Sequence, residues 1–99
     1  NSANIPIGWT QLSKGSINTS ICDIRMLCKI ALDHLATSII IAHNHPSGNN
    51  KPSQEDIKIT NEIKKALKLF EIRLLDHIIV CPKYKEETEF YSFARSGIL

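Results

Sequence analysis

Two histidines and one aspartate are the residues whose types and spacing are best suited to chemistry in this chain. His43 and His45 lie two positions apart after the apolar run of residues 39–41, and Asp56 follows after ten further residues. Such a run predicts a buried strand, and side chains two apart on a strand share a face. A loop and a helix start could return Asp56 to both imidazoles. This set suits a catalytic zinc, which takes three protein ligands and keeps a fourth position for water.

The same stretch has a purely structural explanation. Ser53-Gln54-Glu55-Asp56 matches a helix N-cap serine with an acidic residue three positions later. That explanation covers Ser53 and Asp56 without a metal, but it leaves the two histidines at the strand end unexplained. The histidine pair therefore favours metal binding, and the family resemblance described below supports the same prediction. Pro46, Gly48 and the other turn residues would then shape the loop, and Gly48 is free to adopt a positive φ.

The surrounding elements alternate between strand and helix, which favours a single α/β layer domain over residues 1–99. Helical spacing predicts one buried stripe of Ile24, Leu27, Cys28, Ala31, Leu32 and Leu35, and a second of Ile59, Ile63, Ala66, Leu67 and Phe70. The expected elements are a strand over residues 5–12 containing Trp9, a helix ending at residues 37–38, a strand from Ile39, a helix over residues 53–70, a strand over residues 73–81, a loop over residues 82–89, a strand over residues 90–93 and a tail over residues 94–99.

Composition narrows the function classes. The 99 residues carry a net charge of +2, too weak to predict nucleic-acid binding. Three lysines on the second helix are interrupted by Glu55 and Glu62, which indicates a solvated face; they are Lys58, Lys65 and Lys68. Cys22, Cys28 and Cys81 form no C-x-x-C pair and indicate buried or half-buried reduced thiols. With no signal peptide and no apolar run long enough for a membrane span, we expect a cytoplasmic protein.

The other polar candidates receive structural interpretations. We expect His34 at the surface or boundary of the first helix, and Asn44 on the face opposite the histidine pair. For His77 we favour a satisfied core histidine or a residue that orders a metal ligand over direct ligation. Asp76 points to the opposite face from His77 and could hold Arg73 or a backbone amide.

The site residues carry a resemblance to a known family. His43-x-His45, ten residues and then Asp56, with Ser53 three residues before it, resembles the signature of the JAMM (MPN-domain) metalloproteases. The longer text AHNHPSG, then PS-x-x-D, RLLDHIIV and a closing YSF-x-x-x-G, resembles the bacterial RadC proteins, historically called DNA repair proteins. The resemblance covers about residues 15–99.

This resemblance implies an α/β fold of the JAB/MPN type, with a mixed sheet flanked by helices and an architecture related to cytidine deaminases. It implies that His43, His45 and Asp56 bind one Zn²⁺ per chain and that Ser53 stabilises an oxyanion. The implied activity is hydrolysis of an amide or isopeptide bond in a peptide or protein substrate by a metal-activated water.

One part of the family pattern is missing. JAMM enzymes use an upstream glutamate as general base, whereas the first glutamate here is Glu55. The earlier acids, Asp23 and Asp33, belong to the first predicted helix. The chain is therefore either an N-terminally truncated domain or an inactive relative of these enzymes. We favour truncation, and we expect a domain that binds zinc but hydrolyses poorly and an active longer version that contains the glutamate.

Several other functions remain open at the level of sequence. The chain could be a DNA repair or nucleic-acid-processing factor, or a non-catalytic interaction module that keeps a metal site for stability. A zinc deaminase is disfavoured because the H-x-E and P-C-x-x-C signature is absent. A homodimer is also compatible with the sequence, since the start of the first strand could pair with a partner.

Overall fold

The structure is a computed structural model that describes residues 23–45, 50–82 and 88–99. Their elements are α1 (Ile24–Asp33), β1 (Ser38–Asn44), α2 (Gln54–Lys68), β2 (Arg73–Pro82) and β3 (Thr88–Ser92). The predicted strand over residues 5–12, Trp9, Cys22, Pro46 and Gly48 lie outside the described residues.

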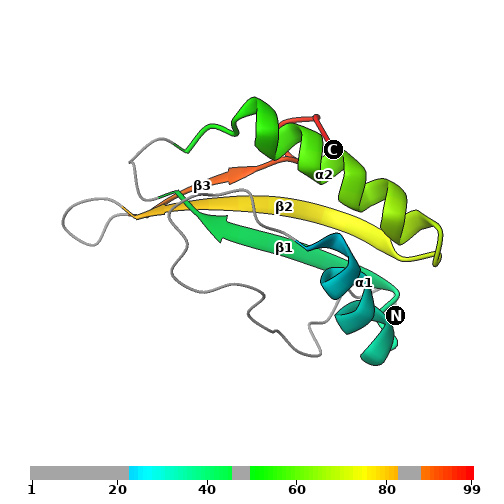
Figure 1. The fold of residues 1–99 in the computed structure, drawn as a ribbon. Helices are drawn as coiled ribbons and strands as arrows, with labels where there is room; N and C mark the ends of the chain where they lie inside the picture. The colour runs from blue at the N-terminus through cyan, green and yellow to red at the C-terminus, as the bar shows by residue number, and fades with distance from the viewer. Residues whose placement is uncertain (1–22, 46–49, 83–87) are drawn as a thin grey trace.

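The strands form one mixed sheet in the order β1-β2-β3, as expected of the predicted α/β fold. β1 and β2 are parallel, with Ile41 opposite His77 and His43 opposite Ile79, and α2 makes the crossover between them (Figure 1). β2 and β3 are antiparallel, with Ile79 opposite Tyr91. Because α2 connects two parallel strands, it starts at the end of the sheet where β1 finishes.

Both helices bury their apolar stripes in one core with the sheet. Leu67 is fully buried and Ile63 almost so, and both pack with Leu74 of β2. The remaining buried members of this core are Leu27, Cys28 and Ala31 of α1 and Ile72 before β2. The predicted stripes are therefore correct at their centres.

The stripes are wrong at the ends of the helices. Leu35 is 86% exposed because α1 ends at Asp33 and Leu35 adopts a left-handed φ of 52°. The amide of the next residue, Ala36, then donates to the Ala31 carbonyl at 2.9 Å, and this bond closes the end of the helix. Leu32 and Phe70 are also exposed, and they line an open depression between α1 and α2.

β3 also differs from the prediction. It begins at Thr88, because Cys81 pairs with Glu89 and Pro82 with Thr88 in the antiparallel ladder. The predicted loop over residues 82–89 includes Thr88 and Glu89, so the predicted start of this strand is wrong. Cys28 and Cys81 are buried free thiols, in agreement with the sequence prediction. None of the described helices is long and apolar enough to cross a membrane.

Candidate metal site

The end of β1 presents both histidines on the face that packs toward the helices. Burial alternates along the strand, with Ile41 and His43 half-buried and Ala42 and Asn44 exposed. His45 lies just beyond β1, but its backbone N–H still donates to the Val80 carbonyl at 2.9 Å. The extended conformation therefore continues, and the rings of His43 and His45 meet edge to face with centroids 4.7 Å apart.

The first turn of α2 holds the carboxylate. Ser53 is the N-cap, and its Oγ accepts from the Asp56 amide at 3.0 Å. Asp56 Oδ2 accepts from the Ser53 amide at 2.9 Å, which completes a capping box. The structural explanation of Ser53 and Asp56 is thus correct, and it also fixes the direction of the Asp56 side chain.

The capping box and the strand end bring the three predicted side chains together. Asp56 Oδ1 lies 3.6 Å from His43 Nε2, and Asp56 Oδ2 lies 3.1 Å from His45 Nε2. One ligand atom from each residue lies within 4.8 Å of the others, so the group could hold a metal ion. The sequence prediction that the three side chains converge is met.

One atom tests whether these residues fit a cation. His43 Nε2 is buried and has no hydrogen-bond partner among the described residues. A buried nitrogen without a partner carries a free-energy cost of about 1–3 kcal/mol. A cation between this nitrogen and the Asp56 carboxylate would remove that cost, so the donor set fits a metal.

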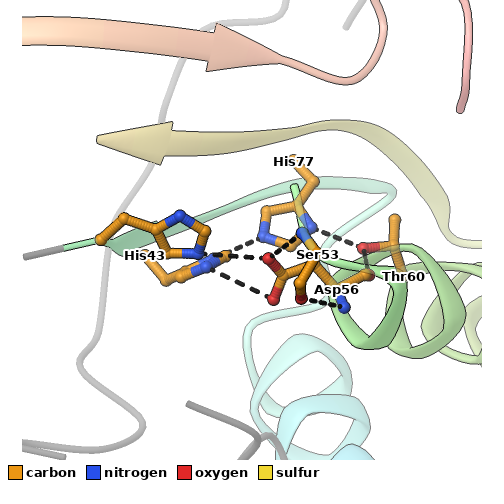
Figure 2. A network of polar contacts seen from close by, with 6 residues as sticks. His43, Ser53, Asp56, Thr60 and His77 are labelled. Carbon is orange, nitrogen blue, oxygen red and sulfur yellow. Dashed lines mark hydrogen bonds and ion pairs between the residues drawn. The ribbon is translucent and has the colours of Figure 1, made fainter. Parts of the chain in front are cut away.

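Two further residues, His77 and Thr60, lie against the group (Figure 2). His77 Nε2 is 2.7 Å from His43 Nδ1, and His77 Nδ1 is 2.6 Å from Thr60 Oγ1. The His77 ring also stacks on Phe93 with centroids 4.5 Å apart. His77 is therefore a buried core residue that contacts a candidate ligand, in agreement with the favoured interpretation.

Sequence reasoning missed Thr60. Its hydroxyl donates to the Asp56 carbonyl at 2.6 Å and is buried on the same helix face as Asp56. Its role could have been inferred only from its position four residues after Asp56, which places the two residues on one side of a helix. A threonine at that position is compatible with many other roles, so the signal was weak.

The electrostatics favour neutral imidazoles at His43 and His77 beside an ionised Asp56 carboxylate. Burial, and to a lesser extent His45, lower the pKa of His43, although Asp56 opposes the shift. Burial and the neighbouring His43 lower the pKa of His77 to about 4. Burial raises the pKa of Asp56, but the hydrogen bonds from Ser53 and the nearby histidines more than compensate, so that it lies below its usual value. A neutral imidazole at His43 and an ionised carboxylate at Asp56 are the protonation states that metal ligands require.

The remaining candidates lie away from the group or hold the backbone. Asp76 accepts from the backbone amides of His77 and Ala94, at 2.8 and 3.0 Å, and from the Ser92 hydroxyl. The prediction of a backbone amide partner for Asp76 is therefore confirmed. His34 is exposed at the end of α1 with Nδ1 2.8 Å from the Ile30 carbonyl, as expected of a surface histidine.

Fold and site together define an α/β domain with a two-histidine, one-carboxylate group at the junction of a strand and the next helix. The family model of the RadC-like JAB domain matches residues 1–98. The chain belongs to the RadC-like JAB domain family, as the sequence resemblance predicted.

Curated relatives agree with this assignment. The chain is 44% identical over 98 residues to a UPF0758 protein of Flavobacterium johnsoniae, and this match covers 99% of the chain and 41% of the relative. It is 51% identical over 80 residues to a UPF0758 protein of Clostridium botulinum, covering 81% of the chain and 35% of the relative. A UPF0758 protein of Porphyromonas gingivalis is 40% identical over 93 residues, or 94% of the chain and 39% of that protein. The chain thus spans about two-fifths or less of these relatives.

Proposed function

We propose that this domain binds Zn²⁺ through His43, His45 and Asp56 and that the protein containing it hydrolyses amide or isopeptide bonds in a peptide or protein substrate. The observation that carries the proposal is the convergence of two imidazole nitrogens and a carboxylate oxygen within 4.8 Å. The family supports it, since the JAB superfamily includes metalloproteases. Three protein ligands are the number that a catalytic zinc site uses, whereas structural sites are closed by four.

The chain's own residues supply the positions that such a reaction needs. Zinc held by three protein ligands provides a nucleophilic hydroxide near neutral pH and polarises a carbonyl. Ser53 uses its oxygen as an acceptor in the capping box, so its hydroxyl hydrogen remains available for a developing oxyanion. Its side chain is exposed, and a substrate could reach it.

The general base is not assigned to a described residue. Asp56 is the one acidic member of the candidate group among these residues, and it is a proposed ligand. Proton transfer to and from the reacting groups by a positioned base contributes about 10²–10⁴-fold in rate. We therefore propose that the longer protein, with a glutamate upstream of β1, is the active form.

Hydrolysis assays on peptide and isopeptide substrates test this proposal. The longer protein loaded with zinc should release product, and the variants His45→Ala and Ser53→Ala should be slower. A matched variant, His34→Ala, alters a histidine outside the site and should retain the rate. If the zinc-loaded protein binds the metal stoichiometrically but releases no product, the domain is a non-catalytic metal-binding module and the hydrolase proposal is wrong.

A further inference from the structure

A continuous line of hydrogen bonds runs from the backbone of α2 through Thr60 and His77 to His43 (Figure 2). We propose that Thr60 and His77 are positioning residues that set the tautomer of His43, so that Nδ1 carries its proton and the Nε2 lone pair faces the metal position. This deepens the proposed function in that Nε2 is the atom offered to the metal. The tautomer itself does not depend on a metal.

The direction of donation along these hydrogen bonds is fixed by Thr60, at the α2 end. The Asp56 carbonyl oxygen can only accept, and Thr60 Oγ1 lies 2.6 Å from it. The single hydroxyl proton of Thr60 must therefore lie between these two oxygens. Thr60 Oγ1 is also 2.6 Å from His77 Nδ1. Having no second proton to donate, Thr60 must accept there, and the proton belongs to His77 Nδ1.

The same reasoning assigns the ring proton of His43. A neutral imidazole has one N–H and one lone pair. With the proton on Nδ1, His77 Nε2 is an acceptor, and the nitrogen 2.7 Å away, His43 Nδ1, must donate to it. His43 Nε2 is then left with its lone pair. This is the buried nitrogen that has no hydrogen-bond partner among the described residues.

The packing around His77 restricts both the orientation of its ring and its tautomer. Its side chain is almost fully buried and its ring is stacked on Phe93 with an interplanar angle of 13°. A ring flip would remove both hydrogen bonds at once. The opposite tautomer would place two lone pairs between His77 Nδ1 and Thr60 Oγ1. It would also force the His43 proton onto Nε2, where a metal would have to displace it.

NMR of the ¹⁵N-labelled chain tests the proposal without a metal. In chelator-treated protein at pH 7.5, long-range ¹H–¹⁵N correlations distinguish protonated from unprotonated ring nitrogens. We expect Nδ1–H and a bare Nε2 for both His43 and His77. Finding the proton of His43 on Nε2 in the unaltered chain would overturn the proposal.

Substitution of Thr60 supplies the matched comparison. Thr60→Val keeps the shape but removes the acceptor, so the Nε2–H forms of His77 and His43 should appear. Thr60→Ser restores a hydroxyl and should return the original tautomers. Unchanged tautomers in a folded Thr60→Val variant would contradict the proposal. Where that variant does not fold, the spectrum of the unaltered chain still decides.

Zinc titration separates this proposal from the proposed function. Disturbing the partner behind a ligating histidine lowers metal affinity about 10–100-fold. Thr60→Val acts on that partner, His77, so it should weaken zinc binding by up to this amount, and Thr60→Ser should not. Equal zinc affinity of a folded Thr60→Val variant and the unaltered chain would count against the positioning role. If the predicted tautomers are observed but the unaltered chain binds no zinc, the inference about His43 stands and the proposed function falls.

Discussion

The buried, neutral state of His77 predicts a specific loss of stability in acid. The pKa of His77 is lowered from its ordinary 6.5 to about 4 in the folded chain, chiefly by burial. As the pH falls below 6.5, the unfolded chain binds a proton that the folded chain does not, so stability is present above this range and is lost toward pH 4. Proton linkage between pH 7.5 and pH 5 gives a loss of about 2 kcal/mol. A domain of this size has a stability of about 5–15 kcal/mol, so the loss is measurable.

Urea unfolding of metal-free protein, followed by far-UV circular dichroism at pH 7.5, 6.5, 5.5 and 5.0, measures this loss. The matched variant is His77→Gln, which does not titrate. His43 titrates in both proteins and moves stability in the same direction, so the quantity of interest is the difference between the two pH dependences. The unaltered chain should lose about 2 kcal/mol more than the variant. Parallel pH dependences would refute the assignment of His77 as a buried neutral group.

Three further substitutions test the packing around the site, each by urea unfolding. Leu67→Ala should lower the free energy of unfolding by about 2–5 kcal/mol, because Leu67 is fully buried in the core. The control Leu69→Ala, at an exposed position, should change it by less than about 0.5 kcal/mol. Similar effects of the two substitutions would contradict the described core. Asp76→Ala removes the acceptor of two backbone amides and the Ser92 hydroxyl and should cost roughly 1–3 kcal/mol, so an unchanged stability would show that these bonds are absent. Ser53→Ala removes the N-cap acceptor of α2 and should cost about 1 kcal/mol; a neutral effect would argue against the capping box.

The directions of the His43, His45 and Asp56 side chains could be predicted from sequence, because each is set by residues close to it in the chain. Alternation along a strand put His43 and His45 on one face, and the N-cap pattern put Asp56 in the first turn of the next helix. Together with the resemblance to the JAMM signature, these two rules led to the prediction that the side chains converge. They required no knowledge of how the sheet is ordered.

The features that sequence reasoning missed depend on other elements. α1 ends early because Leu35 adopts a left-handed conformation that is usual for glycine, and nothing in the sequence marks that position. β3 begins at Thr88 because β2 offers it a partner, which is a tertiary effect. The role of Thr60 depends on His77, which lies 17 residues away on a different element. Single-segment patterns carry no information about such a contact.

Metal analysis of the purified chain tests the central claim most directly. After saturation with zinc and removal of the excess, elemental analysis should find one zinc per chain, as expected for a site of two imidazoles and one carboxylate. His45→Ala and Asp56→Ala should lose the metal, while His34→Ala, which changes an exposed histidine on the end of α1, should keep it. The same zinc content in all four proteins, or none in the unaltered chain, would contradict the account.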